Sequence, residues 1–214
     1  MSLSRFFELY GDRLATGIYT HFKFVIISVP IAFVVALTLG ILLSRIPRLA
    51  RFILPVLSVF QTIPGIVFVG LLFLVTGMVP ATVIIALSIY AIFPILKNTY
   101  VGILEVPRAY IEAAKGCGMS SFQALWRVEI PLALPVIMSG LRMSTVYTVS
   151  WAVLASMIGL GGLGDLIYSG LGSNNNVLIL GGAIPAACMA FIFSLVIDLI
   201  GKLIIPRSLR RKSV

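Results

Sequence analysis

The sequence predicts an all-α integral membrane protein, organised as a single domain over residues 1–214. Hydrophobic residues make up 60% of the chain, charged residues only 11%, and the mean hydropathy is +1.13. A water-soluble domain of this length could not cover so much apolar surface. The net charge of +9 comes from basic residues at the ends of apolar runs, a pattern typical of topology signals beside anionic lipid. We therefore expect contact with membrane lipid and none with nucleic acid.

Five apolar runs are long enough to cross the membrane as helices, because a span needs about 20 residues. The stretch 52–96 is too long for one crossing, and the turn at 76–80 divides it into two. Two more runs follow a polar segment at 112–131. The predicted spans cover residues 24–44, 54–75, 79–97, 136–158 and 178–204.

The loop charges predict the orientation, since Lys and Arg are retained on the cytoplasmic side. The loops after the first and third spans are basic. So is the carboxyl end, with Lys202, Arg207, Arg210, Arg211 and Lys212. The turn at 76–80 carries no charge, and 159–176 carries only Asp165. The amino terminus should therefore lie outside the cell and the carboxyl terminus in the cytoplasm.

The second predicted span contains helix-breaking residues, at Pro55 and in Gln61-Thr62-Ile63-Pro64-Gly65. Backbone groups freed in lipid cost several kcal/mol unless protein or water satisfies them. The pattern is consistent with a kinked or locally opened helix that lines a pathway. It is equally consistent with a proline kink that only shapes packing.

The segment 112–131 is the only long polar stretch between the two apolar halves. Alanines at its start favour helix, and Gly116 and Gly118 interrupt that helix. Ser120 or Ser121 can cap a second short helix that runs toward residue 126. The segment is therefore predicted to be a helix, a glycine turn and a helix.

The second short helix would present Phe122, Leu125 and Trp126 as an apolar edge. Such an edge suits a hydrophobic groove on a soluble partner. The alternative is a loop that folds back on its own bundle.

Glu112-Ala113-Ala114, then Gly118, and later Val128, Ile130 and Pro131 resemble the EAA signature of permease subunits of type I ABC importers. The family usually has Ile and Leu where this chain has Val128 and Ile130. The resemblance implies a five-helix, MetI-like transmembrane bundle with a cytoplasmic coupling helix. It also implies that nine residues couple the chain to an ATPase: Glu112, Ala113, Ala114, Gly118, Ser121, Phe122, Leu125, Trp126 and Pro131.

Three blocks, at 61–64, 94–100 and 161–167, look like the branch that imports osmoprotectants such as glycine betaine, carnitine and choline. The Gly161-Gly162-Leu163-Gly164 stretch also resembles methionine importer permeases, so an amino-acid substrate is the alternative. A self-sufficient secondary transporter is a third class, which would need ionisable residues in mid-membrane and an internal repeat. The spans hold almost no charge, and no repeat is visible.

The resemblance implies a complex in the cytoplasmic membrane of a prokaryote. The chain would pair with a second copy of itself or a related permease, and two copies of a cytoplasmic ATPase would grip it. An extracellular or periplasmic binding protein would deliver the solute. No GxxxxGK[ST] loop occurs, so the chain is not expected to hydrolyse ATP. ATP and Mg²⁺ would belong to the ATPase, and no cofactor or metal is expected in this chain.

Residues 159–164 satisfy GxGxxG, but they end a membrane helix and open no βαβ unit, so they do not indicate dinucleotide binding. We interpret them as a flexible external turn that another backbone can approach closely. The candidate docking residues for the binding protein are Gly161, Gly162, Asp165, Asn174 and Asn175. An ordinary solvated loop is the alternative.

A cationic solute would favour aromatic faces over buried acids, because each cation–π contact contributes about 0.5 to 2 kcal/mol. Aromatic rings inside the spans could equally serve only to pack the helices. The candidate pathway residues are Gln61, Pro64, Tyr90, Phe93, Tyr147 and Trp151.

The remaining polar residues have plain structural interpretations. His21 precedes the first predicted span and is interpreted as an interfacial residue. Asp198 and Lys202 are four residues apart in the last span, so they share a helix face and could pair. Cys117 and Cys188 belong to no CxxC motif and indicate neither a disulfide framework nor a metal site.

Overall fold

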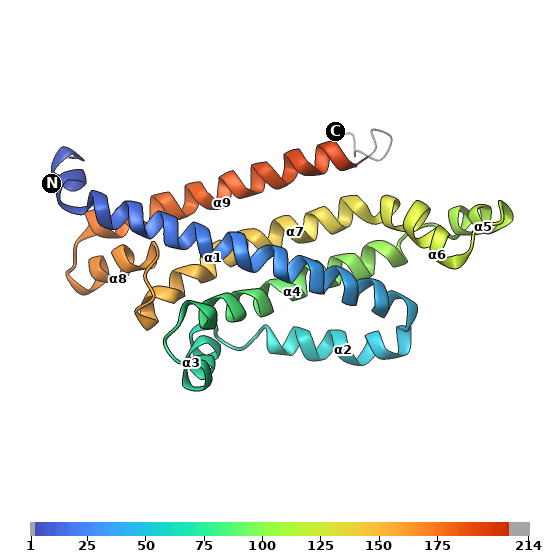
Figure 1. Ribbon diagram of the computed structural model, residues 1–214, viewed down its shortest axis with the longest axis horizontal. Coiled ribbons are helices and arrows are strands. Elements are labelled where there is room, and N and C mark those ends of the chain that lie inside the picture. Colours follow the sequence, from blue (N-terminus) through green and yellow to red (C-terminus); the bar gives the residue numbers. More distant parts are fainter. Residues whose placement is uncertain (1–2, 206–214) are drawn as a thin grey trace.

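The computed structural model describes residues 3–205, and every regular element in this range is a helix. Most helices follow one long axis and form an elongated bundle (Figure 1). In chain order they are α1 (Leu3–Arg45), α2 (Pro47–Phe60), α3 (Gly65–Thr76), α4 (Pro80–Leu104), α5 (Arg108–Gly116), α6 (Ser121–Ala124), the π-helix η1 (Leu125–Glu129), α7 (Ile130–Ala152), the 3-10 helix η2 (Val153–Ile158), α8 (Gly164–Gly172) and α9 (Asn176–Ile204). The predicted all-α class is confirmed.

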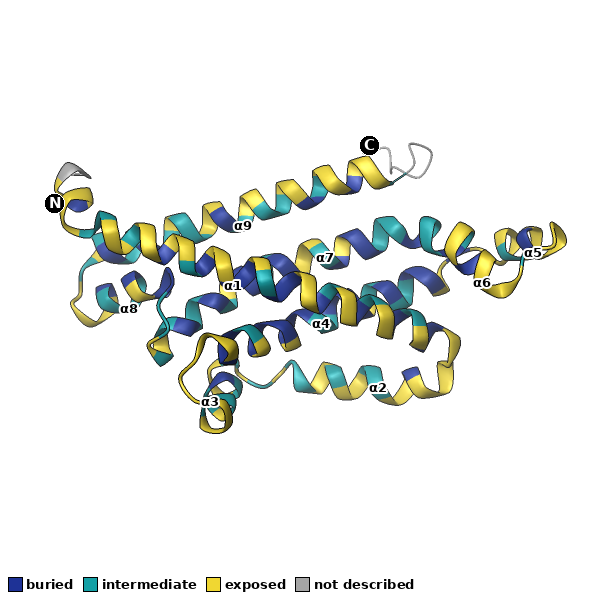
Figure 2. Ribbon diagram, in the orientation of Figure 1, coloured by how far each residue is buried: buried dark blue, intermediate teal, exposed yellow. Residues whose placement is uncertain are grey.

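Within residues 3–205, four helices are long and apolar enough to cross a membrane: α1, α4, the continuous helix Ser121–Ile158 and α9. Helices α2 and α3 meet the same test only as a pair, which is bent by 94°. Counted as one crossing, the pair makes the fifth span. Much of α9 is exposed (Figure 2), and its exposed residues include large apolar ones such as Phe191 and Leu203. Such surfaces belong against lipid, and the chain is a multi-pass membrane protein.

The core lies where α1 packs along α4 and α7. Val25 of α1, Leu87 of α4 and Val149 of α7 belong to one buried cluster. Small residues bring the helices close together, as is common in membrane bundles. A Cβ atom on Gly40 would lie 2.7 Å from the Thr99 side chain, and one on Gly140 would lie 2.6 Å from Asn98.

Helix α1 begins at Leu3, far ahead of the predicted start of the first span at residue 24. His21 therefore lies inside a long helix, where it is 0% exposed and its Nε2 lies 2.9 Å from the carbonyl oxygen of Val149. That carbonyl belongs to the last turn of α7. The interpretation of His21 as an interfacial residue is wrong.

The sequence suggested that Asp198 could pair with Lys202 of the same helix, and the structure gives Asp198 a partner on another helix. Asp198 of α9 pairs with Arg142 of α7, with 3.2 Å between Oδ2 and Nη1. Of the basic residues expected at the carboxyl end, Arg207, Arg210, Arg211 and Lys212 lie outside the described residues.

Candidate functional site

The polar segment 112–131, which we call the coupling segment, lies at one end of the bundle. There α5 and α6 project beyond the long helices (Figure 1), the opposite of a loop that folds back. Helix α5 ends at Gly116, and Gly118 has a φ of +80°, a left-handed conformation that costs glycine nothing. The Met119 N–H donates to the Ala114 carbonyl at 3.0 Å and closes the turn. The expected helix, glycine turn and helix are present.

Ser120, and not Ser121, caps α6. Its Oγ accepts from the Gln123 N–H at 3.2 Å, while Gln123 Oε1 accepts from the Ser120 N–H at 2.9 Å. This reciprocal arrangement is a capping box. After α6 the chain makes the π-helical turn η1 and continues as α7, so that Ser121–Ile158 is one helical stretch. A displacement of α6 therefore acts directly on the span α7.

Two aromatic rings form the exposed edge of the coupling segment. Phe122 is 71% exposed and Trp126 51% exposed, with 6.1 Å between their ring centroids. Leu125 is only 8% exposed, so the edge contains two of the three residues expected. The buried residues Ala114, Ala124 and Leu125 lie where α5 packs on α6 and η1. Glu112, Ala113 and Ser121 are exposed, and Pro131 is half-buried.

A second candidate region is the break between α2 and α3, at residues 61–64. The Gln61 Nε2 donates to the Tyr90 carbonyl at 2.9 Å, and the Tyr90 hydroxyl donates to the Ile63 carbonyl at 2.8 Å. Pro94 follows Tyr90 by four residues and has no N–H, so the Tyr90 carbonyl lacks its helical donor. Gln61 supplies that donor. Two freed carbonyls are thus satisfied by side chains: that of Ile63 in the break, by Tyr90, and that of Tyr90 in α4, by Gln61.

Aromatic rings from four helices, α2, α3, α4 and α7, meet at this break. The Tyr90 ring lies 4.1 Å from Trp151 and 5.2 Å from Phe68, measured between centroids, and both pairs are edge-to-face. Phe60 lies 5.0 Å from Phe68, and Tyr147 stacks on Trp151 at 6.5 Å. Tyr90 is buried, whereas Tyr147 is 46% exposed. We call these five residues the aromatic cluster.

The structure does not bring every candidate pathway residue into this cluster. The Phe93 ring lies under the Lys97 Nζ, at 6.0 Å from the ring centroid. Pro64 is exposed and serves as the N-cap residue of α3. Gln61, Tyr90, Tyr147 and Trp151 are the predicted residues that come together.

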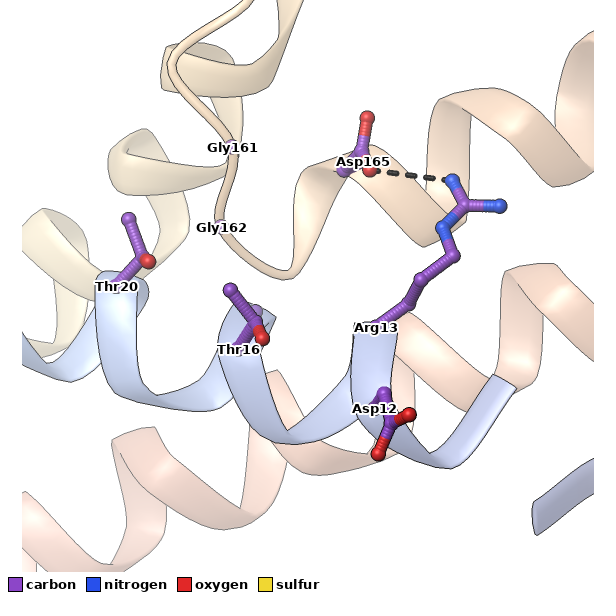
Figure 3. Close-up of a pocket in the computed structure, with 8 residues that line it drawn as sticks. Asp12, Arg13, Thr16, Thr20, Gly161, Gly162 and Asp165 are labelled. Carbon is purple, nitrogen blue, oxygen red and sulfur yellow. Dashed lines mark hydrogen bonds and ion pairs between the residues drawn. The ribbon is translucent and has the colours of Figure 1, made fainter. Parts of the chain in front are cut away.

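The third region is a hollow of about 260 Å³ at the opposite end of the bundle, near α8. Arg13 extends from α1 across it, and its Nη2 lies 3.1 Å from Asp165 Oδ2 and 3.0 Å from Ser169 Oγ (Figure 3). Thr16 and Thr20 point from the same helix toward the Gly161–Gly162 backbone. Gly161 and Gly162 have φ values of +75° and +96°, which favour glycine.

Of the predicted docking residues, Gly161, Gly162 and Asp165 line this hollow. Asn175 instead caps α9, because its Oδ1 accepts from the Val177 N–H at 3.0 Å. Asn174 is exposed with a φ of +51°. Neither asparagine lines the hollow.

Residues 28–210 match the family described as the inner membrane component of binding-protein-dependent transport systems. The chain belongs to this family. The permease is 41% identical to the carnitine transport permease protein OpuCB of Listeria monocytogenes, over 96% of this chain and 94% of the relative. It is 40% identical to the glycine betaine/carnitine/choline transport system permease protein OpuCD of Bacillus subtilis, over 95% of this chain and 90% of the relative. The predicted family is confirmed.

Solved structures agree on the fold of the permease. A chain of the MetNI methionine ABC transporter, in an inward-facing conformation, matches with a TM-score of 0.81 at 21% identity. The match covers 96% of this chain and 100% of the other. An amino acid ABC transporter crystallised with histidines matches with a TM-score of 0.66 at 19% identity. At these identities the likeness shows the fold alone, which is the predicted MetI-like bundle.

Sequence reasoning missed several residues of the permease that these regions contain. Phe60 and Phe68 join the aromatic cluster only because the 94° bend turns α3 back toward α4, and no local pattern predicts that angle. Arg13, Thr16 and Thr20 were missed because the predicted first span begins at residue 24. The absence of proline between residues 3 and 23 is the signal that could have placed them in α1.

Proposed function

We propose that this chain is the membrane-spanning subunit of an ATP-driven importer that moves a quaternary-amine osmoprotectant into the cell. The observation that carries the proposal is the projecting coupling segment, whose exposed Phe122 and Trp126 belong to a helix continuous with a span. The solute class rests on relatives named for carnitine, choline and glycine betaine, which match at 36–41% identity. The permease contains no ATPase motif, so hydrolysis of ATP with Mg²⁺ takes place on a separate partner.

In this proposal the coupling segment docks into a groove on a cytoplasmic ATPase dimer. The aromatic pair supplies the buried anchor, and anchors of this kind dominate the free energy of an interface. Closure of the ATPases on ATP displaces the coupling segments of two permeases relative to each other. Because α6 continues into α7, and α5 follows α4 after a three-residue break, both spans move with the segment.

The orientation of the chain in the membrane follows from docking of the coupling segment on a cytoplasmic ATPase. The coupling end carries Arg45, Arg48 and Lys115, as expected of a cytoplasmic face. The hollow beside Asp165 then faces the outside, where a substrate-binding protein docks. Its Arg13, Asp165 and the half-buried backbone at Gly161 offer polar contacts to such a protein.

The aromatic cluster is the best candidate for contact with the solute inside the membrane. A quaternary ammonium group cannot donate hydrogen bonds, so aromatic faces attract it without a buried carboxylate. Tyr147 and Trp151 lie on the span that continues from the coupling segment. A second permease, either an identical copy or a related chain, completes the pathway around this surface.

The test is co-purification of the permease with its candidate ATPase, followed by measurements in proteoliposomes. We expect ATP hydrolysis to rise when the binding protein is added with carnitine, choline or glycine betaine. Uptake of the same labelled solute should require ATP. Stimulation by methionine in place of these solutes would overturn the solute class, and absence of any complex with the ATPase would overturn the proposal itself.

A further inference from the structure

The coupling segment makes an ion pair with the first span. Arg45 is the last residue of α1, and its Nη2 lies 2.6 Å from Oε2 of Glu129. The Glu129 side chain is only 4% exposed, whereas that of Arg45 is 43% exposed. Carboxylates this deeply buried are rare unless they are paired. The contact joins residues that are 84 apart in the chain.

The π-helical turn at the end of the coupling segment is where Glu129 lies. In η1 the Ile130 N–H donates to the Leu125 carbonyl, so this turn contains one residue more than an α-helical turn. The extra residue changes which faces the helix presents before and after it. Trp126 thus faces solvent at the start of the turn, while Glu129 at its end is buried toward α1.

Helix α1 is not adjacent to the coupling segment in the chain. The segment is continuous with α7 on one side and follows α4 on the other, whereas α1 leads into α2. One helical turn before Arg45, Ile41 of α1 packs against a buried cluster that contains Ile103 of α4 and Ala133 of α7. The ion pair extends this packing to the end of the bundle, so that α1 is attached to the segment at its last residue.

We propose that the Arg45–Glu129 ion pair transmits displacement of the coupling segment to α1, which then moves together with α4 and α7. Arg45 and Glu129 are positioning residues in this proposal, because neither contacts solute or ATP. The proposal rests on the ATP coupling proposed above. It identifies α1 as a moving part of the pathway and not only as a peripheral span.

The experiment uses the whole complex of permease, ATPase and binding protein in proteoliposomes, with glycine betaine as the solute. The variants are Glu129→Gln, Arg45→Gln and the charge exchange Arg45→Glu/Glu129→Arg. The matched control is Arg142→Gln/Asp198→Asn, which removes an ion pair between α7 and α9 away from the coupling segment. Two quantities are measured: solute imported per ATP hydrolysed, and stimulation of hydrolysis by the loaded binding protein.

We expect each single variant to hydrolyse ATP but to import about tenfold less solute per ATP, since coupled residues in one ion pair interact strongly. Arg45→Gln should be the more damaging, because it leaves the Glu129 carboxylate buried without its partner. The charge exchange should recover most of the loss, and the control should keep the wild-type ratio. A pair that only stabilised the fold would change yield and melting temperature but not solute imported per ATP.

Single variants that keep the wild-type ratio would overturn this inference. If neither single variant assembles, the charge exchange decides: restored coupled import supports the inference, and failure to assemble or to couple counts against it. The outcomes also separate the two proposals. Wild-type complex without ATP-driven uptake would contradict the proposed function, whereas normal wild-type uptake with unaffected variants contradicts only the role of the ion pair.

Discussion

Helix α1 forms two ion pairs, one from Arg45 to Glu129 of η1 and one from Arg13 to Asp165 of α8, and the two pairs differ in burial. At the coupling end, Arg45 and Glu129 lie 2.6 Å apart with the carboxylate 4% exposed. At the opposite end, Arg13 and Asp165 lie 3.1 Å apart with side chains 45% and 54% exposed. A buried pair is costly to break once it is formed, whereas an exposed pair contributes little and exchanges readily with water.

The segments around the two ion pairs also differ in how rigidly they are connected to the bundle. The coupling end has a capped helix that continues into a span, a rigid connection suited to transmitting displacement. The opposite end has a turn with three glycines of positive φ, at 159, 161 and 162, followed by the short helix α8. We infer that the coupling end is built for rigid contact with one partner, and that the opposite end can adjust when a binding protein arrives and leaves.

The largest expected effect is at the glycine turn of the coupling segment. In Gly118→Trp a large side chain is placed at a φ of +80° in the turn that precedes the exposed aromatic edge. We expect coupled uptake to fall about 30-fold or more, because blocking the centre of an interface costs ~2 kcal/mol or more. Membrane insertion should be normal. Gly116→Ala is the control, since a Cβ atom there meets nothing within 4 Å; retained uptake in Gly118→Trp would contradict the docking role.

The broken span should respond next most strongly. Gln61→Leu removes the donor to the Tyr90 carbonyl, and an unsatisfied buried backbone acceptor costs about 1 to 3 kcal/mol. We expect a lower melting temperature in detergent and reduced uptake. Ser58→Ala, which removes an exposed hydroxyl of α2, is the control. Unchanged stability and transport in Gln61→Leu would mean that the break does not depend on this hydrogen bond.

The aromatic cluster lies between the two ends of the bundle, and its variants should affect the KM for the solute. Tyr147→Leu and Trp151→Leu should each raise the KM for glycine betaine by about 2- to 30-fold, the loss expected from one cation–π contact. Phe191→Leu, on the exposed face of α9, should leave the KM unchanged. Wild-type kinetics in both cluster variants would remove these rings from the pathway.

The smallest effect is expected at the exposed ion pair. Arg13→Gln should lower stability by less than about 1 kcal/mol, because the pair is solvated and screened. Its clearer effect should be on the affinity of the binding protein, measured at low ionic strength, where charges act over a longer range. An equal loss at about 1 M salt would indicate a structural role for Arg13 instead.

The fold could be predicted largely from the sequence, because hydropathy and chain breaks are local signals. The helix, glycine turn and helix of the coupling segment were predictable for the same reason: Gly118 and the serine cap act on neighbouring backbone. His21 was misjudged because its partner, Val149, is 128 residues away and belongs to another helix. A lone histidine near an apolar run carries no local sign of such a contact.

The candidate sites were predictable only where one helix supplies the residues. Phe122 and Trp126 are four apart on one face, so their common exposure followed from the helical period. The burial of Leu125 depends on packing between α5 and η1, and the pairing of Arg45 with Glu129 depends on how α1 meets α7. Both are tertiary effects that a single sequence does not display.

The most direct test of the central claim compares this permease alone with the full complex in sealed proteoliposomes. With ATPase, binding protein and ATP present, glycine betaine should accumulate inside the vesicles at the expense of ATP. The permease alone, given only an ion gradient, should accumulate none. Accumulation driven by that gradient without the ATPase would contradict the claim that the chain depends on an external motor.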